Sequence, residues 1–208
     1  MDAFKIGLLS VVAAAMAAIP VFASQYAQQA SADVGNAVGV CCAWDARLAD
    51  GQLTYKISGG DAAAQTVVRE AIEEWEVATG ITLDEVSGKG VKADVNVNFK
   101  NGGGMIAGQA LRSFDSDGFV KGVKVTVSGS AFGSVNNVDT VKQVVKHEFG
   151  HALGLNHANF DGDLMSTTVQ TGTGIISGCD IQGVIEANHW KLVDNSTPHA
   201  PHVNHVHC

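Results

Sequence analysis

Eleven residues, HEFGHALGLNH, constrain the fold more than any other part of this 208-residue chain. They place His147, Glu148, His151 and His157 within one short stretch. On a helix, residues four positions apart share a face, so the imidazoles of His147 and His151 can bind one ion. If the helix continued at ~100° per residue, His157 would point to its opposite side. Gly154 can adopt the positive φ that lets the chain leave the helix and return to the ion.

Three imidazoles at one ion predict a zinc site with a fourth position open for water. An open position is typical of a catalytic zinc, whereas protein ligands fill a structural one. Glu148 directly follows the first histidine and is not needed as a ligand, so we predict that it activates the zinc-bound water as a general base. The alternative is a helix with buried histidines or a closed zinc site, which leaves the position of Glu148 unexplained.

The charge balance argues against two classes of partner. Acidic residues outnumber basic ones 21 to 13, which gives a formal net charge of −8. Nucleic-acid binders depend on Lys and Arg to neutralise phosphates, so no nucleic acid is expected. A polybasic membrane-surface protein is disfavoured for the same reason. Hydrophobic residues make up 46% of the chain, which is enough for a packed core.

Residues 1–23 are predicted to be a signal peptide. Lys5 precedes an uncharged apolar stretch, and Val21 and Ala23 occupy the −3 and −1 positions of a small-residue cleavage site. The protein is therefore expected to be secreted and extracellular, without a membrane segment in its mature form. The alternative is an uncleaved anchor at the outer face of the membrane, since about 17 apolar residues is the lower limit for spanning a bilayer.

The four cysteines are expected to form two disulfides, because export exposes them to an oxidising environment. Adjacent cysteines rarely pair with each other, since a disulfide needs a wider separation of Cα atoms. We therefore expect Cys41 and Cys42 to pair with Cys179 and Cys208 in one order or the other. The alternative is four free, buried thiols.

Local patterns predict a mixture of strands and helices without regular alternation, and hence an α+β fold. Alternating or β-branched stretches predict strands at 53–58 and 94–100, and a hairpin of 106–114 with 119–127. Apolar periodicity and capping residues predict helices at 61–79, from about 137 to 154, and from 177 to about 190.

The remaining segments flank a folded domain expected at 44–190. Residues 24–43 lack periodicity and are expected to be a flexible lead-in. Residues 191–208 form a polar, His-rich tail. In an extended chain His205 and His207 project to the same side and could share a metal ion; the alternative is a solvated tail.

At residues 147–157 the sequence resembles the zinc motif of the matrixins, the matrix metalloproteinase-like family of the metzincin peptidases. Met165, in GDLMS, matches the spacing of the family's Met-turn. The resemblance covers roughly 44–190, including LTYKIS, GITLDEV, ADVNVNFK and CDIQGVIEANHW. It implies a mixed twisted β-sheet with three helices, a zinc cleft between upper and lower subdomains, and a methionine beneath the metal. It also implies a substrate extended along an edge strand, for which we take Val123–Val127.

The resemblance further implies an exported zinc-dependent endopeptidase that acts on proteins or peptides. One catalytic zinc would be held by the three histidines of the motif, with Glu148 as the base. The second, structural zinc of animal matrixins is not expected, because His189 is the one other histidine within 44–190. Asp115 and Asp117 could bind calcium, or be solvated turn residues. The alternative function is a non-catalytic metal-binding or adhesion protein that retains the fold.

Overall fold

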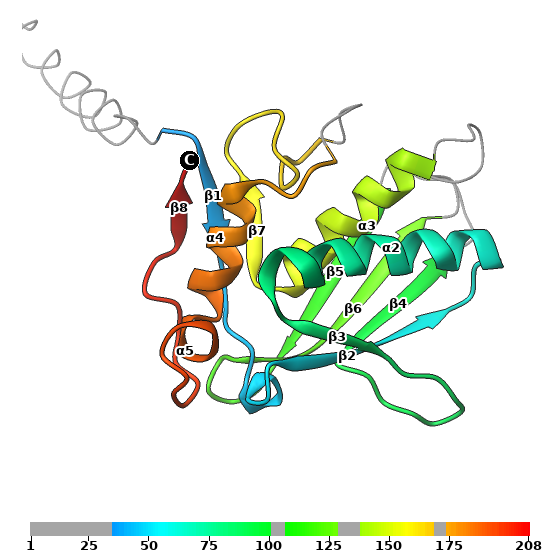
Figure 1. The fold of residues 1–208 in the computed structure, drawn as a ribbon, viewed down its shortest axis with the longest axis horizontal. Coiled ribbons are helices and arrows are strands. Elements are labelled where there is room, and N and C mark those ends of the chain that lie inside the picture. The colour runs from blue at the N-terminus through cyan, green and yellow to red at the C-terminus, as the bar shows by residue number, and fades with distance from the viewer. Residues whose placement is uncertain (1–34, 101–106, 129–137, 169–173) are drawn as a thin grey trace, which may run out of the picture. The chain divides into compact units, whose positions relative to one another are not determined.

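The computed structural model describes residues 35–100, 107–128, 138–168 and 174–208. The predicted signal peptide lies outside these residues. Within them, no helix combines the length and apolar character needed to cross a bilayer. The described chain contains both helices and strands (Figure 1), as the α+β prediction requires.

A five-stranded sheet forms the larger layer, in the order β3-β2-β4-β6-β5. The strands are β2 (Gln52–Ser58), β3 (Thr82–Glu85), β4 (Val95–Lys100), β5 (Gly108–Phe114) and β6 (Val120–Ser128). Neighbouring strands run parallel except β5, which pairs antiparallel with β6 as the predicted hairpin.

The edge strand of this sheet differs from the one that we predicted. Val123–Val127 lies within β6, which pairs with β4 on one side and β5 on the other. It therefore has no open edge for a substrate, and that prediction was wrong. The edge on the β6 side of the sheet is β5.

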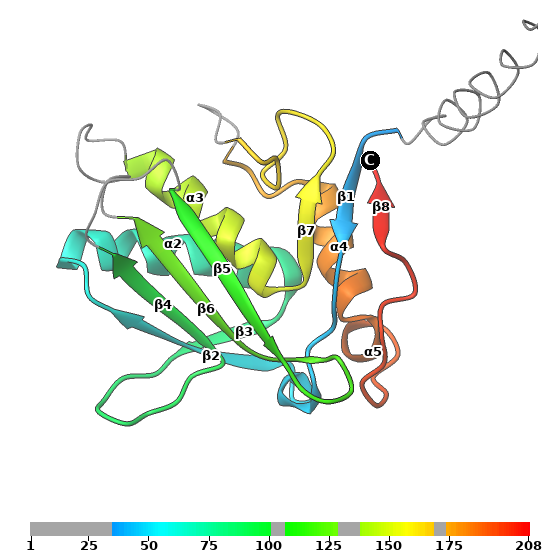
Figure 2. The same cartoon turned by 180° about the vertical axis from the view of Figure 1, so that it is seen from behind.

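Two helices, α2 (Ala62–Thr79) and α3 (Val138–Ala152), cover the same face of this sheet (Figures 1 and 2). The capping signals of α2 are confirmed: the Asp61 side chain accepts a hydrogen bond from the N–H of Ala64, and Gly80 ends the helix with a φ of 74°. Trp75 of α2 is fully buried, and its Nε1 donates to the carbonyl of Lys146 on α3 at 2.9 Å. This contact fixes the helix that carries the zinc motif.

A smaller antiparallel sheet has the order β7-β1-β8. Its strands are β1 (Ala37–Val40), β7 (Leu155–Ala158) and β8 (His205–His207). β1 lies in the segment that we expected to be a flexible lead-in, and β8 lies in the predicted tail. A Cβ on Gly39 would come within 2.7 Å of the Asn156 Cβ, so the close approach of β1 to β7 requires glycine there.

The helix predicted from Ser177 to Trp190 is divided at Asn188 into α4 (Gly178–Ala187) and α5 (His189–Leu192). The Asn188 side chain is buried and accepts a hydrogen bond from the N–H of Trp44 at 3.1 Å. It also donates to the carbonyl of Leu153 at 2.9 Å. These long-range contacts explain the break, which local periodicity does not indicate.

The disulfide pairing that we predicted is wrong. Cys41 pairs with its neighbour Cys42, and Cys179 pairs with Cys208. Antiparallel pairing of β1 with β8 brings Cys208 beside Asn36, with 2.7 Å between the Cys208 N and the Asn36 O. Cys41 lies five residues after Asn36, beyond the opposite end of β1, which is roughly 16 Å at about 3.3 Å per residue and exceeds the reach of a disulfide. The adjacent cysteines are therefore left to pair with each other.

Candidate metal centre

The zinc motif spans the end of α3, a turn and β7. His147, Glu148 and His151 lie on α3, whereas His157 lies on β7. Between them Gly154 adopts a φ of 107°, the left-handed conformation that the sequence predicts. The turn reverses the chain and returns His157 to the two helical histidines.

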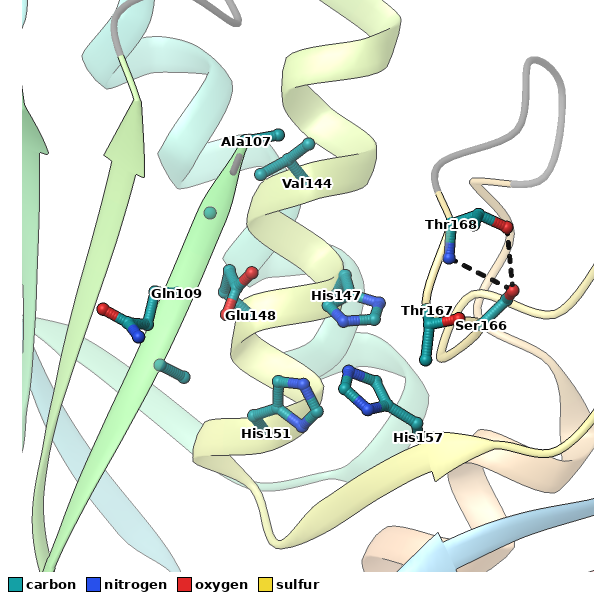
Figure 3. Close-up of a pocket in the computed structure, with 12 residues that line it drawn as sticks. Ala107, Gln109, Val144, His147, Glu148, His151, His157, Ser166, Thr167 and Thr168 are labelled. Carbon is teal, nitrogen blue, oxygen red and sulfur yellow. Dashed lines mark hydrogen bonds between the residues drawn. The ribbon is translucent and has the colours of Figure 1, made fainter. Parts of the chain in front are cut away.

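The three imidazoles converge as predicted (Figure 3). Their ring centroids are 4.8 to 5.4 Å apart, and one ring nitrogen from each lies within 4.8 Å of the others. Metal–nitrogen bonds of about 2.0–2.1 Å place such nitrogens at most about 4 Å apart, so a small inward movement completes a shared site. Three neutral nitrogen donors on one side of an ion are a donor set that suits zinc.

Backbone carbonyls orient two of these imidazoles. The Nδ1 of His147 lies 2.7 Å from the Leu164 carbonyl, and the Nδ1 of His151 lies 2.9 Å from the Leu155 carbonyl. Each Nδ1 therefore carries the proton, which leaves Nε2 as the donor atom for a metal. Burial lowers the pKa of His151 to about 3 and also lowers the pKa of His147, which favours the neutral form that a metal requires.

Met165 lies beneath the centre, as the resemblance implies. It is fully buried, and a Cβ on Gly150 of α3 would come within 2.5 Å of its sulfur. Its carbonyl accepts a hydrogen bond from the N–H of Ala158, next to the third histidine, at 2.8 Å. The turn therefore packs under α3 and holds the end of β7.

The family comparison agrees with this geometry. The family model described as matrixin matches residues 43–187, which include the whole motif and Met165. The chain belongs to the matrixin family. Membership implies a zinc metallopeptidase, and the predicted fold class is confirmed. A comparison with curated proteins finds no match.

Glu148 lies beside the three imidazoles of this matrixin centre. Its side chain is buried, which raises the pKa of Glu148 to about 7. A hydrogen bond from the backbone N–H of Ala110 and the nearby guanidinium of Arg112 act in the opposite direction. A cation bound by the imidazoles would also lower this pKa. Through the hydrogen bond from Ala110, Glu148 contacts β5 of the sheet as well as its own helix.

Gly108 gives β5 the room to lie against Glu148. A Cβ at this position would lie 2.6 Å from Glu148 Oε1 and 2.8 Å from Val144 Cγ1. We expect a Gly108→Ala variant to lose about tenfold or more in kcat/KM for a peptide, because the carboxylate must move from its position. Zinc content should be unchanged, since the three atoms nearest the added methyl belong to Glu148 and Val144 and not to a histidine. Steady-state kinetics and metal analysis measure both quantities.

A matched control for this substitution is Gly178→Ala. No atom lies within 4 Å of a Cβ built on Gly178, and its φ is not positive. The control should therefore keep wild-type kinetics. Equal kinetics for Gly108→Ala would contradict the positioning role that we assign to Gly108.

Arg112 of β5 is a positioning residue that the sequence reasoning missed. Its Nε donates to the carbonyl of His151 at 2.8 Å, and its guanidinium also donates to the carbonyl of Leu155. Arg112 therefore holds the end of α3 and the start of β7 together. Gly108, Ala110 and Arg112 are less exposed than their neighbours on β5. The sequence carries no signal for this, because the apolar Leu111 lies on the exposed face of the strand.

A cavity of about 590 Å³ opens beside the three imidazoles and Glu148. Residues 108–110 of β5 form one wall, and residues 166–168, which follow Met165, form the opposite one (Figure 3). An edge strand, a buried carboxylate and the candidate metal ligands thus face one space.

The other predicted metal sites have different outcomes. Asp115 Oδ1 accepts hydrogen bonds from the N–H groups of Asp117 and Phe119, both at 2.9 Å. This turn role accounts for Asp115, and calcium binding stays a prediction. His205 and His207 do project to the same side of β8, with 3.1 Å between their Nε2 atoms.

Proposed function

We propose that this matrixin is an exported zinc endopeptidase, in which His147, His151 and His157 hold the ion and Glu148 is the general base. One observation carries the proposal: three converging imidazoles and a buried carboxylate line the same cavity. A closed structural site would need a fourth protein ligand. Within the residues that the structure describes, this cluster offers three candidate ligands, all of them histidines.

Each group has a chemical role in peptide hydrolysis. When bound, zinc supplies Lewis-acid chemistry, which polarises a carbonyl and makes a water molecule more acidic. Glu148 takes the proton of the attacking water and passes it to the nitrogen of the leaving amine. The N–H of Ala110 holds this carboxylate in place during the transfer.

The substrate is proposed to lie beside β5 as an additional strand. β5 is an edge strand among the described residues, so an extended peptide can pair with those backbone groups of its outer side that have no partner within the sheet. Residues 108–110 of the same strand line the cavity. A peptide in this position would pass in front of Glu148 and the three imidazoles.

Export is supported by two observations. The apolar stretch that follows Lys5 is typical of a signal peptide. All four cysteines are paired in disulfides, which persist outside the cytoplasm.

Hydrolysis of a peptide library by the purified full chain tests this function. The zinc-loaded protein should cleave internal peptide bonds, lose activity after treatment with a chelator, and regain it when zinc is added. Mass spectrometry of the products identifies the bonds that are cleaved. Zinc binding without any cleavage would contradict the proposal and favour the non-catalytic alternative.

A further inference from the structure

A second group of ligand side chains lies in the C-terminal segment, outside the residues that match the matrixin model. It consists of His189, Asp194, His199 and His202, whose ligand atoms all lie within 4.8 Å of one another. The Asp194 Oδ2 lies 3.1 Å from the Nδ1 of His189 and 3.0 Å from the Nε2 of His199. The ring of His202 is centred 5.0 Å from the ring of His189 and 4.7 Å from that of His199.

We propose that these four side chains bind a second divalent transition-metal ion, with zinc the expected metal. Three imidazoles and one carboxylate are donors that zinc accepts, and four protein ligands complete its tetrahedral coordination. The site would therefore be closed and structural, in contrast to the three-histidine centre. The proposal does not depend on peptidase activity.

The folded body holds one end of this segment in place. His189 begins α5, and the next residue, Trp190, is buried, with its Nε1 donating to the Trp44 carbonyl at 3.1 Å. The N–H of Asp194 donates to the carbonyl of His189 at 3.0 Å, which closes a turn between these two ligands. The first two ligands are therefore close together before any metal binds.

The other end of the segment is also attached to the folded body. The N–H of Val40, on β1, donates to the carbonyl of Asn204 at 2.8 Å, and Cys208 is tied to Cys179 by a disulfide. Holding both ends reduces the conformational entropy that the connecting residues lose when His199 and His202 meet an ion.

The orientation of His199 also suits a ligand. Its Nδ1 lies 3.0 Å from the carbonyl of Ala200, so this nitrogen carries a proton and Nε2 faces the cluster. A backbone acceptor of this kind is the usual partner of a metal-binding imidazole.

Ion pairing without a metal is the competing explanation. It accounts for His189 and His199, both of which contact the Asp194 carboxylate. It does not account for His202, which packs against both rings but forms no hydrogen bond within the described chain. A shared ion explains why a third imidazole lies beside the same carboxylate.

The stoichiometry of bound zinc tests the proposal on the full, disulfide-bonded chain. After dialysis against zinc and then metal-free buffer, the wild type should retain about two equivalents, one at each centre. A His199→Ala/His202→Ala variant should retain about one and keep its peptidase activity. The matched control His205→Ala/His207→Ala removes two other tail histidines and should retain about two.

A second measurement uses a variant that lacks the first centre. His147→Ala/His151→Ala should still bind about one zinc ion, and added zinc should raise its melting temperature. That increase should disappear when His199→Ala/His202→Ala is added. One equivalent in the wild type, two in the His199→Ala/His202→Ala variant, or loss of zinc from the His205→Ala/His207→Ala control would each overturn the proposal.

Discussion

A Glu148→Gln variant is expected to lose at least ~10²–10⁴-fold in kcat for peptide hydrolysis while it retains its zinc. Glutamine has nearly the same shape, so its side-chain oxygen can still accept the hydrogen bond from the Ala110 N–H. It cannot take a proton from the attacking water. The candidate zinc ligands are the three histidines and do not include Glu148, so the variant should bind zinc as the wild type does.

Peptide kinetics and zinc content of the purified variant are measured together. A Glu73→Gln variant is the matched control, because Glu73 is an exposed residue of α2 on which the same charge is removed. The control should keep wild-type kinetics. Activity of Glu148→Gln within tenfold of the wild type would contradict the general-base role.

Local sequence signals predicted the central layers of the fold well. Asp61 and Gly80 fix the ends of α2 because one side chain caps a helix N-terminus and the other residue adopts a positive φ. The predicted hairpin forms β5 and β6 around the Asp117-Gly118 turn. In each case the physical cause lies within a few residues of the element.

The elements that were missed depend on distant partners. β1 and β8 are short, and their pairing joins residues 37–39 to residues 205–207. Neither segment shows a strong local pattern, so nothing in the sequence indicated the pair. The error in the disulfides follows from this one, because the β1–β8 register separates Cys208 from Cys41.

The candidate site was predictable where its ligands are close in sequence. His147, His151 and the turn at Gly154 follow from helix geometry alone. Arg112 and Gly108 contact the site from β5 and could be found only once the sheet was placed against α3. The tail cluster was missed for a related reason, since it combines His189 of α5 with Asp194 and two later histidines.

A Gly154→Ala variant is expected to lose about 3 kcal/mol or more of its free energy of unfolding. The φ of 107° is strained for any residue with a side chain. A Cβ there would also lie 2.5 Å from the Cys42 carbonyl oxygen and 2.7 Å from the Ala187 Cβ. Backbone atoms and a helix side chain cannot move aside easily, so overpacking adds to the strain. Denaturant unfolding of the zinc-free proteins measures the loss.

Gly80→Ala separates the two causes. Gly80 also has a positive φ, 74°, but a Cβ there meets no atom within 4 Å. It should therefore show the backbone strain alone, about 1 kcal/mol or slightly more. The additional loss in Gly154→Ala reports the contact of the turn with Cys42 and α4.

Because the same turn returns His157 to the metal centre, Gly154→Ala should also bind zinc more weakly, whereas Gly80→Ala should not. Equal losses of stability in the two variants, with zinc affinity unchanged in both, would show that the turn tolerates a side chain and does not set the position of His157.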